Sequence, residues 1–501
     1  MERTIDLINE RIRDGNAVVV TAERMPDLVA ELGEEGALAE VDVVTTGTFG
    51  AMCSSGVFLN FGHADPPIRM ERVWLNDVEA YAGVAAVDAY LGATQQSETR
   101  RDEYGGAHVI EDLVSGSSVE MRAHSRGTDC YPRRTIRTEI GLSDLNQAVM
   151  VNPRNAYQRY NAAVNTTDRV LNTYMGMLLP NHGNVTYSGA GVLNPISNDP
   201  SFRYIGSGVP IFLGGAEGMI VGEGTQHSPA GGFGTLMVSG DLKAMTPDYL
   251  RAATMTGYGV TLYLGLGVPI PVLDLETVRA TAVTDADIEV DVVDYGVPGR
   301  ARPSLRKVSY AELRSGHVEI EGEEVATSPL SSFRMARQVA SVLADRISSG
   351  RMTLALPTRP IDRTKTVRPM VETAQGPRVR EIMDRQVVAI TGDESVTVAA
   401  KKLLKGETNH LVVLDHEGRL AGVVTTYDLS KAVLRPERAM TVADVMTRRV
   451  ITTESDEPVD IAARKLQRNN ISALPVVDAD RHVIGMLTGT NLSRLIGRGR
   501  A

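Results

Sequence analysis

The C-terminal part of the 501-residue chain repeats itself, and this repeat constrains the fold more than any other feature. Residues 379–404, VREIMDRQVVAITGDESVTVAAKKLL, are matched by residues 442–467, VADVMTRRVITTESDEPVDIAARKLQ. Each copy predicts a short helix, a strand, a longer helix, two strands and a closing helix. Two copies of one supersecondary unit bury their apolar faces against each other, so we expect them to form one paired module.

The two copies resemble a tandem pair of CBS domains. In that family the ribose-binding pattern is a glycine, two hydrophobic residues, a threonine and a final aspartate, and the first copy has it complete as GVVTTYD, with Thr425 and Asp428. The second copy reads GMLTGTN, with Thr488 and with Asn491 in place of the acid. A carboxylate can accept both ribose hydroxyls, whereas an amide offers one acceptor oxygen. The resemblance implies an adenine nucleotide of the AMP or ATP type, and we favour the cleft with Thr425 and Asp428. Other pairs of this kind serve only for dimerisation.

A proline-rich stretch with few apolar residues precedes the repeat and marks a domain boundary. We therefore predict a large domain over residues 1–355, a linker over 356–377, a first CBS domain over 378–437 and a second over 438–499.

The composition is that of a globular protein, 43% hydrophobic and 23% charged, with a net charge of -10. This charge argues against nucleic-acid and anionic-membrane binding. Two cysteines are too few for a disulfide framework and indicate a reducing compartment. The uncharged stretch Ala252–Leu273 is long enough to span a bilayer, but its glycines and prolines favour buried strands. We expect a cytoplasmic protein that does not contact membranes.

The large domain alternates helix and strand patterns near its N-terminus. The spacing predicts helices over residues 4–14 and 25–33 and strands over 17–21 and 41–45. The region from 182 to 271 is rich in glycine but contains neither a Walker A loop nor a GxGxxG fingerprint. The fold class predicted is therefore mixed α/β (α+β), with a large Gly-rich catalytic domain followed by the tandem CBS module.

Cys130 lies in a strongly basic stretch, MRAHSRGTDCYPRRTIR, that spans residues 121–137. Nearby positive charge stabilises a thiolate, the form that attacks carbonyls and accepts sulfur. Gly127 and Pro132 place the cysteine in a turn or loop. A buried, inert cysteine with solvent-facing arginines is an equally weighted alternative.

Cys53 lies in TTGTFGAMCSSGVFLNFGH, residues 45–63, where a strand leads into a turn of glycine and serine. Such a turn leaves backbone amides free to approach a ligand, and it is also a common plain turn. The cysteine makes us favour a functional reading of this turn slightly.

Residues 1 to about 355 resemble the homocysteine-biosynthesis family, whose members are similar to L-aspartate semialdehyde sulfurtransferase and often carry a CBS pair. The resemblance rests on four stretches: TTGTFGAMCSSGVFLNFGH, GTDCYPRR, NPRNAYQRYNAAVN and GVPIFLGGAEGMIVGEGTQH. The family has one important cysteine in each of the first two stretches. These cysteines match Cys53 and Cys130 here.

The resemblance implies that reduced sulfur enters L-aspartate 4-semialdehyde and that two electrons then yield L-homocysteine. We expect Cys130 to carry the transferable sulfur and attack C4, with Cys53 resolving the persulfide or supplying the second thiol. Proton donation is expected from His124 or His182, although each histidine is more often structural. The residues that we expect to bind the substrate are Arg133, Arg134, Arg137 and His124.

No flavin, nicotinamide or iron–sulfur motif is present, so we expect no cofactor in the catalytic domain and no metal. The resemblance implies a ferredoxin-like protein as electron donor, a sulfide source and a homodimer. The sequence does not identify the sulfur donor, the sign of any CBS effect or the oligomeric state.

Three alternatives stay open. The first is another cysteine-nucleophile transferase that acts on a small carboxylate substrate. The second is a non-enzymatic adenine-nucleotide sensor. The third is a zinc site of Cys53, Cys130, His63 and His124, which no CxxC or HxxxH spacing supports.

Overall fold

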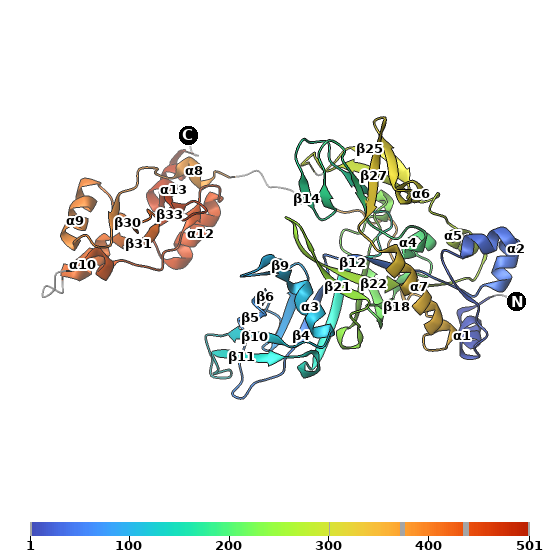
Figure 1. Ribbon diagram of the computed structural model, residues 1–501. Helices are drawn as coiled ribbons and strands as arrows, with labels where there is room; N and C mark the ends of the chain where they lie inside the picture. Colours follow the sequence, from blue (N-terminus) through green and yellow to red (C-terminus); the bar gives the residue numbers. More distant parts are fainter. Residues whose placement is uncertain (1–2, 300, 371–375, 434–439, 499–501) are drawn as a thin grey trace. The chain divides into compact units, whose positions relative to one another are not determined.

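The computed structural model describes residues 3–299, 301–370, 376–433 and 440–498. The chain divides into two compact units, residues 1–368 and 369–501. Figure 1 shows the first unit in blue to yellow and the second in orange to red. Each is described by itself. No helix among the described residues is both long enough and apolar enough to cross a membrane.

The largest sheet of the first unit has nine strands and is antiparallel wherever its strands pair. Helix α7 (Phe333–Ser348) packs on β3 (Thr48–Ala51) and β22 (Gly259–Gly267). Glycine allows this close approach, since a Cβ added at Gly265 would lie 3.1 Å from Cγ2 of Val339. In spatial order the strands are β21 (Leu250–Met255), β22 (Gly259–Gly267), β18 (Pro210–Leu213), β19 (Ala216–Glu223), β20 (Leu236–Asp241), β12 (Gln147–Asn155), β4 (Gly56–Asn60) and β7 (Asp88–Gly92), and β3 (Thr48–Ala51) pairs β22.

The first unit also has two six-stranded sheets, whose strands alternate along the chain with those of the nine-stranded sheet. The first, in spatial order, comprises β11 (Thr135–Ile140), β10 (Val119–His124), β5 (Arg72–Leu75), β6 (Val78–Ala80), β8 (Gln96–Ser97) and β9 (Arg101–Gly105). The second comprises β25 (Ser304–Ser309), β24 (Glu289–Asp294), β13 (Ala162–Val164), β16 (Val185–Tyr187), β27 (Glu323–Pro329) and β26 (His317–Ile320). Smaller sheets are β1 (Val19–Thr21) with β2 (Val43–Thr45) and β23 (Pro269–Pro271), β14 (Leu171–Thr173) with β15 (Gly176–Leu178), and β17 (Gly206–Ser207) with β28 (Arg359–Pro360).

The helices of the first unit follow their capping signals. Thr4 caps α1 and Ser332 caps α7, each by accepting a backbone N–H, as short hydroxyl side chains do at helix starts. The predicted helix over 25–33 continues to residue 40, with a break at Gly33, where φ is 75°. The helices are α1 (Ile5–Arg13), α2 (Met25–Glu40), α3 (Gly106–Val114), α4 (Pro195–Asn198), α5 (Leu275–Thr281), α6 (Tyr310–Arg314) and α7 (Phe333–Ser348).

The stretch that is long enough to span a bilayer, 252–273, forms strands β21, β22 and β23, as its glycines and prolines predicted. The expected linker divides between the units. Its first part packs on the first unit, since β28 pairs β17 and the Asp362 carbonyl lies 3.0 Å from Nε2 of His227. Residues 371–375 of that linker lie outside the described residues, as does the expected boundary between 437 and 438.

The second unit contains the two predicted copies of one fold. The first copy has α8 (Val379–Ile382), β29 (Ala389–Thr391), α9 (Val396–Lys405), β30 (His410–Leu414), β31 (Leu420–Thr425) and α10 (Thr426–Val433). The second has α11 (Val442–Val445), β32 (Thr453–Glu454), α12 (Val459–Asn469), β33 (Ala473–Val477), β34 (Val483–Thr488) and α13 (Gly489–Arg498).

The copies pack reciprocally. The sulfur of Met446 would lie 2.7 Å from a Cβ added at Gly422, and the sulfur of Met383 would lie 2.6 Å from one at Gly485. Each glycine is thus required by the methionine of the other copy. The mixed α/β fold class with a C-terminal CBS pair, predicted from the sequence, is confirmed.

Candidate active site

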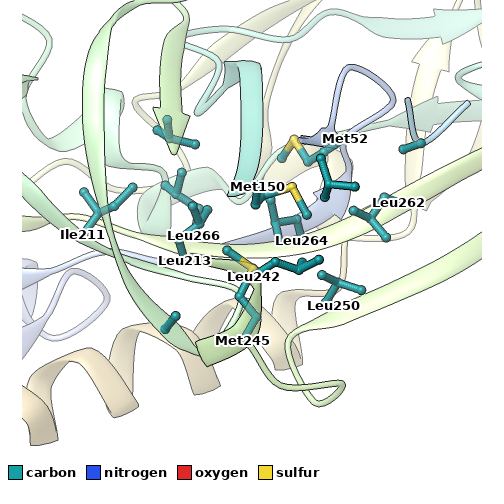
Figure 2. Packing of buried hydrophobic residues seen from close by; sticks show 14 of the residues in the cluster. Met52, Met150, Ile211, Leu213, Leu242, Met245, Leu250, Leu262, Leu264 and Leu266 are labelled. Atoms are coloured by element: carbon teal, nitrogen blue, oxygen red, sulfur yellow. The ribbon is translucent and has the colours of Figure 1, made fainter. Parts of the chain in front are cut away.

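Cys53 occupies the turn between β3 and β4. The preceding residue, Met52, is buried in the main core, where Figure 2 shows it in one cluster with Met150 and Leu262. The backbone N–H of Met52 donates to the carbonyl of Leu262 at 2.7 Å. After the turn, Gly56 allows close packing, because an added Cβ would lie 2.2 Å from the hydroxyl oxygen of Tyr90. The turn is therefore fixed on both sides of the half-buried thiol.

The thiol of Cys53 faces a cavity of about 780 Å³. Loops that connect strands of the nine-stranded sheet form one wall, and loops of the second six-stranded sheet contribute the other. The aromatic residues of the lining are Tyr157, Tyr160, Tyr174, Tyr258, Tyr295 and Phe233. A cavity of this size can enclose a small metabolite.

Tyrosine hydroxyls surround the thiol. Burial raises the pKa of Tyr157 and of Tyr258, and negative charge on Cys53 raises each further. The ring of Tyr258 lies 6.2 Å from the ring of Tyr174, whose hydroxyl forms a 2.6 Å hydrogen bond with that of Tyr295. Tyr157 and Tyr258 therefore remain protonated at neutral pH and can donate hydrogen bonds to an anion.

Among the residues that the structure describes, three arginines line the same cavity, and no aspartate, glutamate or lysine does. Arg154, at the end of β12, donates from Nε to the hydroxyl of Thr225 at 3.1 Å. Its carbonyl accepts a hydrogen bond of 3.3 Å from Ser54, the residue after Cys53. Arg159 is exposed, and Arg302 stacks on Tyr295 with 4.0 Å from Cζ to the ring centroid. In a chain of net charge -10, this concentration of positive charge favours an anionic ligand.

Cys130 lies elsewhere, in the loop between β10 and β11, and its side chain is exposed. Reciprocal backbone hydrogen bonds between Thr128 and Tyr131, at 2.9 and 3.1 Å, form the turn that holds it. The ring of Tyr131 stacks on His63 at 6.0 Å. The loop position predicted for Cys130 is correct, and the buried alternative is excluded.

The basic residues near Cys130 are partly neutralised. Glu120 forms ion pairs with both Arg122 and Arg137, and Glu71 lies 3.4 Å from Arg126. Arg133 instead donates to the carbonyl of Asp65 at 3.0 Å. Within the described ranges, neither Arg133 nor Arg134 forms an ion pair.

The two cysteines are not brought together. The Cys130 loop packs against residues 63–67, which follow β4, whereas Cys53 precedes β4. Both thiols are free. No group of three or more His, Cys, Asp or Glu side chains suited to a metal occurs among the residues described, so the zinc arrangement of Cys53, Cys130, His63 and His124 is not formed.

Neither expected histidine lines the cavity. His124 lies edge-on to Trp74, with ring centroids 5.6 Å apart. His182 lies with Nε2 3.8 Å from Glu321. Sequence reasoning also missed the tyrosines and arginines of the cavity. The stretch NPRNAYQRYNAAVN contains Arg154, Tyr157 and Arg159 and could have indicated them, whereas nothing in the local sequence marks Arg302.

In the second unit the expected nucleotide-binding residues form matching helix caps. Asp428 accepts from the backbone N–H and the hydroxyl of Thr425, at 2.9 and 2.6 Å. Asn491 accepts the same two bonds from Thr488, at 2.8 and 2.6 Å, and its amide donates to Asp384 at 3.1 Å. The asparagine thus replaces the aspartate as a cap, but its amide group is already engaged.

Comparison with known proteins gives consistent matches. Residues 17–354 match the family described as "Homocysteine biosynthesis enzyme, sulfur-incorporation", and residues 379–435 and 442–498 match the CBS domain. The chain is 52% identical over 498 residues to the L-aspartate semialdehyde sulfurtransferase of Methanosarcina acetivorans, covering 99% of each chain. It is 50% identical over 510 residues to the enzyme of the same name from Methanocaldococcus jannaschii, again covering 99% of each.

Among solved structures, the CBS domain pair of protein MJ0100 in complex with 5'-methylthioadenosine and S-adenosyl-L-methionine is 39% identical. That match covers 25% of this chain and 98% of the other, with a TM-score of 0.24. CBSX2 in complex with AMP is 28% identical, covering 25% of this chain and 100% of the other, with a TM-score of 0.23. The chain belongs to the family of sulfur-incorporating homocysteine biosynthesis enzymes and carries a C-terminal pair of CBS domains.

Proposed function

We propose that this chain transfers reduced sulfur to L-aspartate 4-semialdehyde and forms L-homocysteine. One hydrogen sulfide, two electrons and two protons replace the aldehyde oxygen, which leaves as water. The family match and the names of the two full-length relatives support this reaction. The chemistry of the Cys53 cavity supports it independently.

The observation that carries the proposal is that Cys53 lines a cavity whose described lining has arginines and tyrosines and no carboxylate. An aldehyde carbon is electrophilic, and a cysteine thiolate or persulfide attacks it once the substrate is held beside it. We therefore assign the attack on C4 to Cys53, and not to Cys130 as we expected from the sequence. The thiolate of Cys53 adds to C4 and the aldehyde oxygen takes up a proton, which gives a hemithioacetal. Hydrogen sulfide then replaces Cys53 at C4, water leaves, and the two electrons and two protons reduce the resulting thioaldehyde to the thiol.

Tyr157 is the candidate that stabilises the oxygen of this adduct. Its ring is partly buried and lies near Cys53, whose charge contributes to the raised pKa of Tyr157. A hydroxyl that stays protonated can donate a hydrogen bond to the oxyanion as charge develops. Tyr157 replaces His124 and His182 in this role, because neither histidine lines the cavity.

Cys130 suits a different step. Its exposed thiol, beside Arg133 and Arg134, is accessible to a sulfur donor from outside. We propose that Cys130 takes the outer sulfur of a donor persulfide, which leaves as a thiol, and that two further electrons from the external reductant release this sulfur as sulfide. Free sulfide at high concentration reaches Cys53 without this step. The external electron donor, a ferredoxin-like protein, and the homodimer remain predictions.

The CBS pair is proposed to bind an adenine nucleoside or nucleotide at the Thr425–Asp428 cap. Asp428 retains a carboxylate that could accept ribose hydroxyls, whereas the equivalent Asn491 already donates to Asp384. The names of the related CBS pairs, solved with adenosyl ligands and with AMP, support this class of ligand. Regulation of the first unit by such a ligand is part of the proposal.

The test is homocysteine formation by the purified full chain with aspartate semialdehyde, sulfide and a chemical or ferredoxin-type reductant. Product that depends on all three additions supports the reaction. If the wild type makes no homocysteine with any reductant, the proposed reaction is wrong. Thiol-dependent consumption of another small carboxylate substrate would then favour a different cysteine transferase.

A further inference from the structure

Arg302 is the least satisfied cation of the Cys53 cavity. Its Nε is buried and has no hydrogen-bond partner, and no ion pair or hydrogen bond of its guanidinium occurs within the described residues. A buried, unpaired donor costs free energy, and at the wall of a cavity a bound ligand can supply the missing acceptor. Arg203 and Arg251 of the same unit, by contrast, form ion pairs, with Asp274 at 2.5 Å and with Glu111 at 3.0 Å.

The position of Arg302 is fixed without any use of its hydrogen-bond donors. The guanidinium stacks on the face of Tyr295 at 4.0 Å, and Tyr295 is held in turn by its hydroxyl bond to Tyr174. A stacked guanidinium keeps its planar row of N–H donors free at the edge. That edge is suited to a carboxylate, which accepts two parallel hydrogen bonds.

The geometry relates Arg302 to Cys53 through the tyrosines. Tyr258 lies close enough to Cys53 for the thiolate charge to raise its pKa, and the rings of Tyr258 and Tyr295 both contact Tyr174, at 6.2 and 5.9 Å. Arg302 lies against the far member of this aromatic group. Cys53 and Arg302 line the same cavity, so one ligand in it can contact both residues.

We propose that Arg302, stacked on Tyr295, binds the α-carboxylate of the substrate in the Cys53 cavity and selects aldehydes that carry a carboxylate. This inference rests on the proposed function for the identity of the substrate. Because the cavity lining has no acidic side chain, the α-amino group gains no ion pair there. Succinate semialdehyde, which has the same carbon chain and no amine, should therefore bind through Arg302 as well.

The test measures protection of Cys53 from iodoacetamide in the full-length chain with Cys130→Ser, so that one thiol is followed without turnover. Succinate semialdehyde is compared with butanal, which has the aldehyde but no carboxylate. We expect succinate semialdehyde to protect at about tenfold lower concentration than butanal, because the clamp adds a charge-assisted pair of hydrogen bonds. Arg302→Gln should abolish this preference, and Arg302→Lys should retain part of it.

Arg169→Gln is the matched control, since Arg169 lines an adjoining hollow with Tyr174 and Arg302 but not this cavity. In Arg169→Gln, succinate semialdehyde should protect Cys53 at the same concentration as in the parent chain. Circular dichroism should report the same fold for all variants. In steady-state assays Arg302→Gln should raise KM for aspartate semialdehyde at least tenfold with a smaller effect on kcat.

Equal preference in Arg302→Gln and the parent, or no preference in the parent, would overturn the clamp. The proposed reaction can fail separately. If no homocysteine forms but protection still depends on Arg302, the clamp is supported and the proposed reaction is wrong.

Discussion

The hydroxyl of Thr261 donates a hydrogen bond of 3.2 Å to the sulfur of Cys53, and Thr261 is fully buried in β22. This contact connects the nine-stranded sheet directly to the thiol. A hydroxyl that donates to sulfur fixes the position of the thiol and stabilises negative charge on the sulfur during attack. The scaffold thus contributes to the reactivity of Cys53 as well as to its position.

Thr261→Val should slow alkylation of Cys53 by iodoacetamide at pH 7. Valine fills the same space but removes the hydrogen-bond donor to the sulfur, so we expect a rate decrease of about threefold to tenfold. The measurement uses a Cys130→Ser background. Thr254→Val, at an exposed position of the neighbouring strand β21, should leave the rate unchanged. An unchanged rate in Thr261→Val would show that the hydrogen bond does not stabilise the thiolate.

Tyr157→Phe should lower kcat by a factor on the order of 100 with little change in KM, because a donor to the oxyanion is lost. Burial, with the charge of Cys53 adding to it, raises the pKa of Tyr157, so the hydroxyl stays protonated across the neutral and mildly alkaline range. Tyr157 should therefore contribute no alkaline limb to the pH–rate profile below pH 10. Tyr81→Phe, at an exposed tyrosine, is the control. Wild-type kcat in Tyr157→Phe would exclude the proposed role.

Asp428→Ala should weaken binding of adenine nucleotides or S-adenosyl-L-methionine to the full chain by at least tenfold in calorimetry. The carboxylate is the group proposed to accept the ribose hydroxyls. Asn491→Ala should have a smaller effect, since its amide already donates to Asp384. Equal losses in the two variants would instead indicate that both positions act as helix caps only.

Asp274→Asn should lower the free energy of unfolding at pH 7 by about 1 kcal/mol or less, since the ion pair with Arg203 is partly exposed. Asparagine is as good a helix cap as aspartate, so the cap of α5 is retained. The hydrogen bond from Arg203 lowers the pKa of Asp274 in the folded state.

The pair therefore stabilises the folded protein at pH values above about 4, the pKa of an aspartate in the unfolded chain. This stabilisation is lost as the pH falls through the lower pKa that Asp274 has in the folded protein. The difference between Asp274→Asn and the wild type should accordingly shrink below about pH 4 in denaturant titrations. A difference that is independent of pH would contradict this assignment.

The CBS pair could be predicted in detail because a repeat encodes the same local signals twice. The helices that Thr4 and Ser332 begin were also readable, since capping residues and apolar spacing are local. Residues 285–294 alternate acidic and apolar side chains, a pattern typical of a strand at the edge of a sheet, but β24 lies between β25 and β13. Strand order depends on long-range pairing, which alternation alone does not specify.

The site was predicted in part. Cys53 is conspicuous in the sequence as a cysteine in a Gly/Ser turn, and the structure places it at the wall of a cavity, while its role stays a prediction. The arginines around Cys130 suggested an activated thiol, yet Glu120 and Glu71 neutralise three of them across the sheet and from a neighbouring loop. Arg302 and Cys53 line one cavity only because loops of two sheets pack together, and no local sequence pattern predicts such long-range packing.

The central claim is that Cys53, and not Cys130, attacks the aldehyde. The most direct measurement is homocysteine formation from aspartate semialdehyde, excess sulfide and reductant by the wild type, Cys53→Ser and Cys130→Ser, each with its fold checked by circular dichroism. We predict that Cys53→Ser forms no product and that Cys130→Ser, supplied with free sulfide, retains most of the activity. Full activity in Cys53→Ser, or complete loss in Cys130→Ser alone, would contradict the assignment.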